Sequence, residues 1–487
     1  MIQREKPEEF VHTNVRVYPP LLQCRDSECS GRQTLTGVGP TVLELADLQR
    51  YWPPLSSERG GYSVHPAVTG SPIDFLPLDI PSGPAALCIT IDALGGYSCV
   101  GVVGVAGERF RTACAGDGLT LALIELARLG TWKRGRFAGV PGSAIQVHRL
   151  GAETALSTDQ THMSVIAGEV IIKWLNHPDL RGDQLLRLEQ IRAAGFTAVP
   201  QNLAHVTWET PRGPRAVVLI DHYVEGAEDG WTWCLQAARD YAHDPTGSKE
   251  WTPEFIGRAL GNLIADLHAA MAKPTALLPN PTANATDADV RTWAVDACGL
   301  FSRADQSFTG QLADRDTRRG WGILRDCLDV GIPRIPPVIS LTHADLHIGQ
   351  VLLTPSNDLL LVDFEGDPLA QERPVLDSPM RDVAHMATSL ALVGQAAAKR
   401  DGESDWLWAW TRRACTQFVK GYRSAGEQLG LPAAFDQRLF HAFVAEQLAA
   451  ELIYSHTVLP RWSYAPLGVV RSVDKTGLLA PHREPMS

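Results

Sequence analysis

The segment HADLHIGQVLLTPSNDLLLVDFEGDP, residues 343–368, constrains the fold more than any other part of this 487-residue chain. Its third residue is an acid, Asp345, and Gln350 follows five residues later. Two apolar stretches then lead to a second acid, Asp363, three residues before Gly366. The apolar stretches predict a pair of short strands around residues 351–364, within a largely helical region. A polar hairpin with solvated acids is the alternative, but it requires these residue types to coincide by accident.

Two acids at this spacing suit the transfer of a phosphoryl group. That reaction needs a carboxylate near the acceptor hydroxyl and oxygen ligands for a metal ion that bridges the nucleotide phosphates. We assign Asp345 the first role, and Gln350 and Asp363 the second, because Mg²⁺ prefers oxygen donors. Gly366 lets the chain turn close to the phosphates. His343 is expected to hold the loop by hydrogen bonds rather than to perform chemistry.

This segment resembles the catalytic loop of the aminoglycoside phosphotransferase and maltokinase superfamily. The usual form there is HGD, followed by Asn or Gln and then by a second Asp before a turn. The ending DFEGDP is more similar to the maltokinase branch than to protein kinases, which have DFG. The resemblance implies an α+β, protein-kinase-like (aminoglycoside phosphotransferase-like) bilobal fold with ATP and Mg²⁺ as cofactors.

The chain divides into three predicted parts. Residues 1–142 are rich in proline and glycine turns, with strand-like segments at 84–107 and one helical segment, and we expect an N-terminal β-rich cap. Residues 143–229 contain strand, strand, helix and strand in the order of the small nucleotide lobe of a kinase-like fold. Residues 230–487 are mainly helical, including an amphipathic segment at 253–271. We expect the catalytic loop and the acceptor site in this C-terminal lobe.

Lys173 is the candidate cation for the ATP phosphates, because it alternates with apolar residues on a predicted strand. A lysine on a strand is usually a solvated edge residue, but its position ahead of the catalytic loop favours the phosphate role. The polar turn before it contains the candidate phosphate-contacting residues Asp159, Thr161 and Ser164. Its sequence DQTHMS resembles the corresponding loop of actinobacterial glucosamine kinases, although an ordinary polar hairpin turn is the competing interpretation.

Two other parts of the nucleotide site are less sharply indicated. Asp221 and Tyr223 follow an apolar strand at residues 217–220, where adenine would bond to hinge backbone atoms, but they could equally be linker residues. The family usually has an acid on the following helix that holds the lysine. Asp183 and Glu189, in a helical pattern at residues 180–194, are both candidates, and the sequence does not choose between them.

The acceptor site is indicated by AEQLAAELIYSHTVLPRWSYAP, residues 445–466. At 100° per residue, Gln447, Glu451 and Tyr454 share one face of a helix. A site for an amino sugar should combine carboxylates for the ammonium group with an aromatic plane for the ring. Such a set is present in Glu446, Glu451 and Trp462. An amphipathic helix with solvated acids, followed by a tryptophan that packs a loop, is the alternative.

The same segment, read as EQ…E…Y…LPRW, resembles the C-terminal signature of the glucosamine kinases within the maltokinase-like group. The resemblance implies an ATP-dependent phosphotransferase that converts glucosamine to glucosamine 6-phosphate. A maltokinase, which makes maltose 1-phosphate, and an aminoglycoside phosphotransferase are the alternative enzymes. A pseudokinase that binds nucleotide without chemistry is the alternative outside enzymes. The retained candidates Lys173, Asp345, Gln350 and Asp363 argue against it.

Charge and hydropathy along the chain argue against binding to nucleic acid and against insertion into a membrane. The net charge of −11 argues against a general nucleic-acid binder, because phosphate contacts need clustered Lys and Arg. The longest weakly charged run, residues 84–107, contains Asp92 and many glycines, so we expect no membrane span. The N-terminus MIQREKPEEF has charges where a signal peptide needs an apolar core, and we expect a cytoplasmic protein. The sequence leaves the oligomeric state open.

Overall fold

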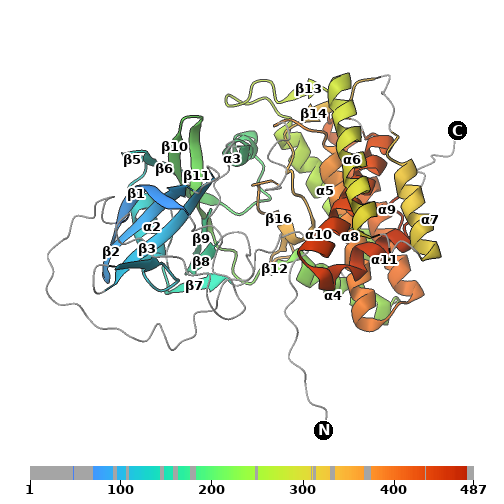
Figure 1. Cartoon of the computed structure of the whole chain (residues 1–487), viewed down its shortest axis with the longest axis horizontal. Helices are drawn as coiled ribbons and strands as arrows, with labels where there is room; N and C mark the ends of the chain where they lie inside the picture. Colours follow the sequence, from blue (N-terminus) through green and yellow to red (C-terminus); the bar gives the residue numbers. More distant parts are fainter. Residues whose placement is uncertain are drawn as a thin grey trace, which may run out of the picture. The chain divides into compact units, whose positions relative to one another are not determined.

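The computed structural model describes residues 48, 70–91, 96–105, 109–142, 147, 149–156, 163–175, 183–246, 251–308, 310, 314–329, 335–366, 375–433 and 435–479 (Figure 1). The chain forms two compact units. The first contains residues up to Leu185 together with Pro200–Glu225, and the second contains Leu186–Val199 together with the chain from Gly226. Two candidate phosphate-contacting residues, Asp159 and Thr161, lie outside the described residues.

Among its described residues, the first unit contains two sheets together with helix α2 (Leu119–Arg128). The smaller sheet is antiparallel, in the order β1 (Ser71–Ile80), β2 (Gly83–Ile91), β3 (Tyr97–Val105) and β4 (Arg109–Thr112). The larger sheet has the order β5 (Trp132–Arg134), β6 (Phe137–Pro141), β10 (Asn202–Thr210), β11 (Gly213–His222), β9 (Val170–Trp174), β8 (Met163–Ala167) and β7 (Glu153–Leu156). The strands predicted within residues 84–107 are present as β2 and β3.

One hydrophobic cluster contains residues from both sheets of the first unit. Leu87 and Ile89 of β2, Leu123 of α2, and Ile172 and Trp174 of β9 belong to one buried cluster. Strands β5 and β6, from the region predicted as a cap, belong to the same sheet as the predicted nucleotide-lobe strands, because β6 pairs with β10. The division into a cap and a nucleotide lobe at residue 142 therefore stays a proposal.

A carboxylate from β7 caps helix α2. The residue before the helix, Gly118, has a left-handed φ of 95° and no capping side chain of its own. The Glu153 carboxylate instead accepts hydrogen bonds from the amides of Gly116 (2.7 Å), Gly118 (2.9 Å) and Leu121 (3.0 Å). Amides at a helix N-terminus have no partner within the helix, so an acid placed there stabilises it. The edge strand β7 is thereby tied to α2.

Replacing Glu153 by alanine is expected to lower the free energy of unfolding by about 1–2 kcal/mol, because three amides lose their acceptor. Denaturant unfolding followed by tryptophan fluorescence measures the change, since Trp174 and Trp208 are buried in the core of the first unit. Glu125→Ala on the same helix is the matched control, because Glu125 forms an exposed ion pair with Arg128. Equal losses in the two variants would contradict the capping role.

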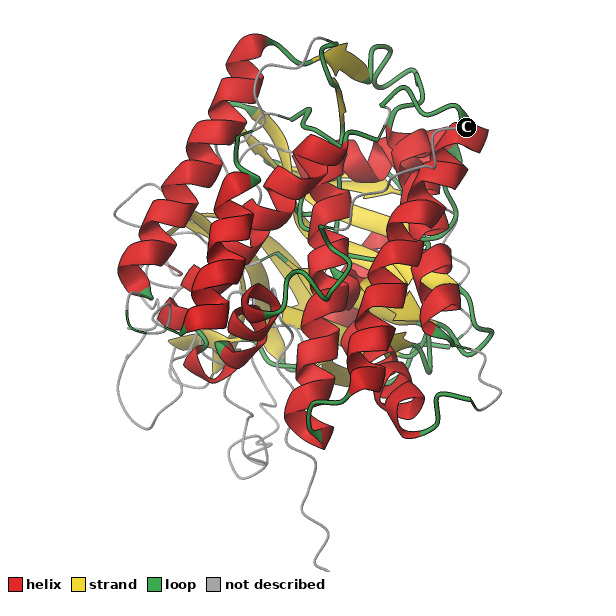
Figure 2. Cartoon of the chain, turned by 90° about the vertical axis from the view of Figure 1, so that its right-hand side faces the viewer, coloured by secondary structure: helices red, strands yellow, loops and turns green. Residues whose placement is uncertain are grey.

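The second unit is mainly helical, and Figure 2 shows its long helices. Its helices are α4 (Gly230–His243), α5 (Pro253–Met271), α6 (Asp287–Ser307), α7 (Arg315–Asp326), α8 (Met380–Asp401), α9 (Asp405–Leu429), α10 (Gln437–Thr457) and α11 (Tyr464–Arg471), with most of α3 (Asp183–Ala194). Short strands pair as β12 (Glu228–Asp229), β15 (Val351–Leu353) and β16 (Leu359–Leu361), and as β13 (Thr282–Asn284) with β14 (Val338–Ser340). Single 3₁₀ turns lie at η3 (Ile348–Gln350) and η4 (Pro460–Trp462).

Helix α8 forms the centre of the second unit. It is buried on all sides from Met380 to Ala397, and it packs against α4, α9, α10 and α11. The helix predicted at residues 253–271 is present as α5, with Thr252 as its N-cap and Pro253 in its first turn. Gly257 and Gly261 allow α9 to approach, because a Cβ at either would lie 2.4 or 2.5 Å from a carbonyl oxygen of α9.

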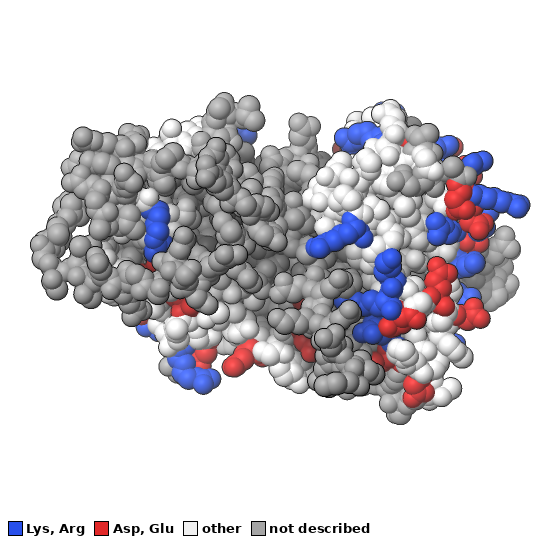
Figure 3. All heavy atoms as spheres, turned by 60° about the horizontal axis from the view of Figure 1, so that its bottom comes forward, with Lys and Arg blue, Asp and Glu red and all other residues white. Residues whose placement is uncertain are grey.

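No helix in the described ranges is long and apolar enough to cross a bilayer. On the face drawn in Figure 3, Lys and Arg side chains of the second unit are interspersed with Asp and Glu.

Candidate active site

The strand pair predicted between the two acids is present as β15 and β16, joined in register from Val351 and Leu361 onward. Asp345 precedes η3, which ends at Gln350, and Asp363 follows β16 by two residues. Two non-glycine residues of these loops have left-handed backbones, Ala344 with a φ of 70° and Asp363 with a φ of 69°. Such conformations persist where surrounding contacts hold them, and they are common at functional sites.

His343 joins the two loops, as expected from the sequence. Its Nε2 lies 3.0 Å from the carbonyl oxygen of Val362, and its ring packs against Phe364 with 4.7 Å between centroids. Burial lowers the pKa of His343, although the charge of Asp382 and the bond to Val362 act in the opposite direction. The ring is therefore neutral at neutral pH and donates from Nε2.

Asp382, in the first turn of α8, anchors the backbone of the Asp345 loop. Its fully buried carboxylate accepts hydrogen bonds from the amides of His343 (2.6 Å) and Ala344 (3.0 Å). The Nε2 of His268 lies 3.2 Å from the same carboxylate, and its Nδ1 lies 2.9 Å from the Tyr422 hydroxyl. Burial raises the pKa of Asp382, but the bond from His268, nearby charges and the His343 amide outweigh it and lower the pKa to about 2. Asp382 is therefore an ionised anchor.

The two predicted metal ligands lie together. The side-chain amide of Gln350 donates from Nε2 to Oδ2 of Asp363 over 3.2 Å. Both side chains offer oxygen donors, and Mg²⁺ in phosphotransfer sites commonly takes one or two protein oxygens with the remainder from phosphates and water. The donor set therefore fits Mg²⁺. The loops that carry the two acids are also close, because a Cβ on Gly366 would lie 3.3 Å from the Cβ of Ala344.

Lys173, Ser164 and Asp221, three of the predicted nucleotide residues, lie on neighbouring strands of the larger sheet. Lys173 of β9 is in register with Ser164 of β8, and the residues on either side of Lys173 face the core. The Asp221 carboxylate accepts a hydrogen bond from Asn202 over 2.7 Å. Burial raises the pKa of Asp221 to about 6, against the Asn202 bond and the charge of Lys173. Asp221 is thus an electrostatic neighbour of Lys173, which the sequence did not indicate.

The residue predicted near adenine and the two acids predicted to hold Lys173 make contacts within the described chain. The Tyr223 amide donates to the carbonyl oxygen of Glu169 over 2.8 Å, so this N–H is engaged within the first unit. Glu189 forms an ion pair with Arg192 one turn along α3. Asp183 is buried at the start of the same helix. The partner of Lys173 stays open between Asp183 and the neighbouring Asp221.

Sequence comparison identifies the family of this chain. No family model matches it. A glucosamine kinase from Mycolicibacterium smegmatis is 33% identical over 377 residues, which cover 74% of this chain and 89% of that protein. The chain belongs to the glucosamine kinase family. A second glucosamine kinase, from Streptacidiphilus jiangxiensis, is 29% identical over 371 residues, covering 73% of this chain and 81% of that protein.

Solved structures of glucosamine kinases have the same fold. A glucosamine kinase in complex with glucosamine, ADP and inorganic phosphate superposes with a TM-score of 0.66 and 25% identity, covering 82% of this chain and 94% of the other. A glucosamine kinase in another crystal form gives a TM-score of 0.68 at 24% identity, with the same coverage. The predicted α+β, protein-kinase-like fold is confirmed. Membership of the glucosamine kinase family makes the chain an ATP-dependent phosphotransferase.

Within this glucosamine kinase fold, the predicted acceptor residues Glu451 and Trp462 are both buried. Glu451 is 2% exposed on α10 and accepts a hydrogen bond from the side-chain amide of Gln447 over 3.1 Å, so these residues share a face as predicted. Trp462 is 3% exposed in η4. Its ring packs edge-on against Trp231 and Tyr464, with 5.6 and 5.4 Å between ring centroids. The indole N–H groups of Trp231 and Trp462 have no hydrogen-bond partner in the described part of the chain.

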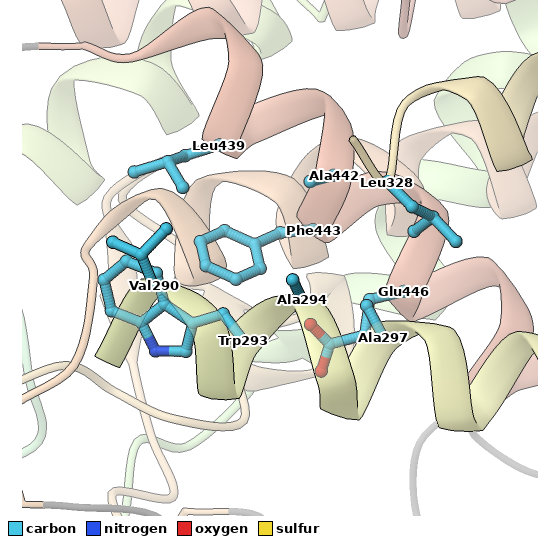
Figure 4. A pocket seen from close by; sticks show the side chains of 9 residues that line it. All are labelled: Val290, Trp293, Ala294, Ala297, Leu328, Leu439, Ala442, Phe443 and Glu446. Carbon is cyan, nitrogen blue, oxygen red and sulfur yellow. The ribbon is translucent and has the colours of Figure 1, made fainter. Parts of the chain in front are cut away.

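Glu446, the third predicted acceptor residue, forms a buried ion pair. Its Oε1 accepts from Nη1 of Arg381 over 2.8 Å, and Arg381 also donates to Asp377 and stacks on Phe443. Figure 4 shows Glu446 at one end of a pocket between α6 and α10 that is otherwise apolar. The cavity there measures about 10 Å³, room for one water molecule and far too small for a sugar. The ion pair with Arg381 ties Glu446 to α8, and its role in the acceptor site stays a prediction.

The sequence did not indicate two residues that support the loops, Arg187 and Asp382. The Arg187 side chain donates to the backbone carbonyls of Thr342 (2.9 Å), Phe364 (3.3 Å) and Glu365 (3.1 Å). An acid in the first turn of an apolar helix was a weak signal for Asp382. Nothing local marks Arg187, which precedes Thr342 by 155 residues.

Proposed function

We propose that this chain transfers the γ-phosphoryl group of ATP to O6 of glucosamine, giving glucosamine 6-phosphate. The observation that carries the proposal is the 33% identity to a glucosamine kinase over 74% of the chain. The 25%-identical glucosamine kinase solved with glucosamine and ADP supports the same acceptor and nucleotide. The paired loops of Asp345 and Asp363 supply the chemistry that such a transfer needs.

Asp345 acts as the base in the proposed mechanism. Its carboxylate orients the 6-hydroxyl of the sugar and accepts its proton as the oxygen attacks the γ-phosphorus. The anchors on either side support this role, because Asp382 fixes the backbone of Ala344 and His343 joins this loop to Val362. A base held in this way loses little entropy when the sugar hydroxyl arrives.

Gln350 and Asp363 hold the metal in this proposal. The hydrogen bond between their side chains orients the Asp363 carboxylate before nucleotide binds. Mg²⁺, when bound by these two side chains and by phosphate oxygens, would neutralise the charge on the phosphates. The left-handed backbone of Asp363 sets the direction of its carboxylate.

Lys173 is the proposed phosphate cation in the first unit. Ser164, opposite it in register, and the turn with Asp159 and Thr161 supply hydroxyl and amide donors to the phosphates. Asp221 keeps its proposed place in the nucleotide site, where it also orients Lys173. The Tyr223 amide is already bonded to Glu169. The backbone near Tyr223 therefore offers carbonyl oxygens, rather than this N–H, to the adenine ring.

Glu451 and Trp462 are the proposed contacts of the amino sugar. The Glu451 carboxylate pairs with the ammonium group at C2, and Gln447 fixes the position of that carboxylate. The buried indole N–H of Trp462 is free to donate to a sugar hydroxyl. Glu446 stays in the proposed set as a supporting acid, since its contact with Arg381 fixes α10 against α8.

Replacing Glu451 by glutamine is expected to raise the KM for glucosamine by roughly tenfold or more, because a buried carboxylate no longer pairs with the ammonium group. The KM for ATP should stay within about twofold of the wild-type value, since the change removes a sugar contact. Steady-state kinetics with each substrate varied in turn measure both constants.

Glu427→Gln, the same change on the exposed end of α9, is the control and should alter neither constant. Unchanged glucosamine kinetics in Glu451→Gln would remove Glu451 from the sugar site.

The proposed reaction is tested by a coupled ADP-release assay over glucosamine, glucose, maltose and several aminoglycosides. ADP release that depends on glucosamine, and is weaker with every other acceptor, is the expected result. Release with maltose but none with glucosamine would indicate a maltokinase, and release with aminoglycosides alone would indicate an antibiotic-type phosphotransferase. Nucleotide binding without release for any acceptor would indicate a pseudokinase.

A further inference from the structure

Arg187 of α3 joins the two loops that carry the proposed base and the proposed metal ligand. Its Nε donates to the carbonyl oxygen of Thr342, three residues before Asp345, over 2.9 Å. Its Nη1 donates to the carbonyl oxygens of Phe364 and Glu365, directly after Asp363, over 3.3 and 3.1 Å. One side chain therefore fixes both backbones from the same position. It is 6% exposed, so these bonds form away from bulk water.

The bonds of Arg187 lie beside the two unusual backbone conformations of the site. Ala344 follows Thr342 by two residues, and Asp363 immediately precedes Phe364. Both have φ values near 70°, a conformation that residues with a Cβ rarely adopt without outside support. Asp382 supports the first loop through two amides. Arg187 supports both loops through their carbonyl oxygens.

Gly366, the glycine of the second loop, leaves space for the Arg187 side chain. This glycine has a φ of 79°, and a Cβ at this position would lie 3.0 Å from Nη1 of Arg187. A larger residue would therefore press on the guanidinium group that holds the loop. The glycine after Asp363, expected from the sequence to bring the chain close to the phosphates, also leaves room for Arg187.

The planar guanidinium group is suited to this task. It presents five N–H donors in a fixed fork, so Nε and Nη1 can point to carbonyls of different loops at once. A lysine has one nitrogen at the end of a flexible stem and cannot hold the same separation between two loops. The geometry calls for arginine and not simply for a positive charge.

We infer that Arg187 is a positioning residue that sets the Asp345 carboxylate relative to the Asp363 carboxylate. The inference rests on the proposed function, in which these acids serve as base and metal ligand. Arg187 touches neither substrate nor metal in this account, and it acts through the backbones of the two loops. Its loss should therefore alter turnover and the metal dependence of nucleotide binding, with a smaller effect on binding of the sugar.

The first test is the kinetics of Arg187→Ala, Arg187→Lys and Arg192→Ala in the full-length chain. Arg192 lies on the same helix, is exposed and pairs with Glu189, so Arg192→Ala is the matched control. Both Arg187 variants are expected to lose about a hundredfold in kcat, because small displacements of reacting groups have effects of that size. The KM for glucosamine should change less than about threefold. Wild-type kcat in Arg187→Ala would overturn the inference.

Two further measurements separate positioning from a general loss of structure. Millimolar guanidinium chloride should restore at least about tenfold of the lost kcat to Arg187→Ala, and should leave the wild type and Arg192→Ala unchanged. Calorimetric titration with ADP should show that Mg²⁺ improves affinity about tenfold less in Arg187→Ala than in the wild type, with metal-free affinity unchanged. A loss of kcat that guanidinium chloride does not rescue, or a response to Mg²⁺ as large as in the wild type, would overturn the inference.

The titration also keeps this inference distinct from the proposed reaction. If the wild-type protein releases no ADP with glucosamine, the proposed function fails. The Mg²⁺ response of ADP binding then still decides the role of Arg187, because that measurement needs no acceptor. An equal response in the wild type and Arg187→Ala would refute the positioning role whatever the acceptor.

Discussion

Replacing Asp345 by asparagine is expected to lower kcat for glucosamine by roughly a thousandfold, the scale of a general base in proton transfer. The affinity for ADP should stay within about twofold of the wild-type value, because the change preserves the shape of the loop and removes only its base. The backbone anchors from Asp382 to His343 and Ala344 do not involve the replaced side chain. Single-turnover kinetics and calorimetry measure the two quantities.

Asp358→Asn is the matched control, since Asp358 is an exposed acid between β15 and β16 of the same segment. Its kcat should equal that of the wild type. An equal loss of turnover and of ADP affinity in Asp345→Asn would argue against a base and in favour of a structural role for Asp345.

Replacing Asp382 by alanine should lower the free energy of unfolding by about 3 kcal/mol, because a buried anion and its hydrogen bonds are lost together. Two amides of the Asp345 loop and the ring of His268 would lose their acceptor. Turnover should fall as well, since Ala344 would lose the bond that holds its left-handed backbone. Denaturant unfolding and steady-state kinetics measure the two effects.

The difference in stability between the wild type and Asp382→Ala should also become smaller as the pH falls. The pKa of Asp382 is lowered to about 2 in the folded protein, below its value of 3.8 in a free side chain. A lowered pKa means that the carboxylate stabilises the fold above about pH 4, and that this contribution is lost as the pH falls towards 2. The melting temperatures of wild type and Asp382→Ala should therefore converge in acid.

Asp405→Ala is the control for this comparison, because Asp405 is also an acid in the first turn of a helix but is exposed. Its effect should stay below about 1 kcal/mol, the size of a helix-dipole interaction. A loss of unfolding free energy as small as this in Asp382→Ala would contradict the anchoring role. A difference in melting temperature from the wild type that does not narrow in acid would contradict it as well.

Elements with a local pattern could be predicted from the sequence. The helix at Pro253–Met271 and the strands β8, β9, β15 and β16 follow from apolar periodicity and short-range turns. Strand β10 was not predicted. Its residues 203–208 are all buried, so the alternation that marks a half-exposed strand is absent. The sharing of one sheet by β6 and β10 is a non-local contact that no local pattern records.

The same distinction applies to the candidate site. Asp345, Gln350 and Asp363 fall within one short segment, and their spacing predicts the chemistry proposed for them. Asp382 and Arg187 support that segment from 38 and 155 residues away, through backbone atoms whose positions are not written in the sequence. Glu446 is predicted to contact the sugar, and its buried partner Arg381, 65 residues away, is a contact that helical periodicity could not reveal.

The identity of the phosphorylated product decides whether the chain phosphorylates glucosamine at O6. The full-length protein would be incubated with ATP, Mg²⁺ and glucosamine, and the product examined by proton–phosphorus correlation NMR. The proposed reaction predicts a phosphorus coupled to the two protons on C6 of glucosamine, formed in equal amount to ADP. A phosphorus coupled to the C1 proton, or ADP formed without any phosphorylated glucosamine, would contradict it.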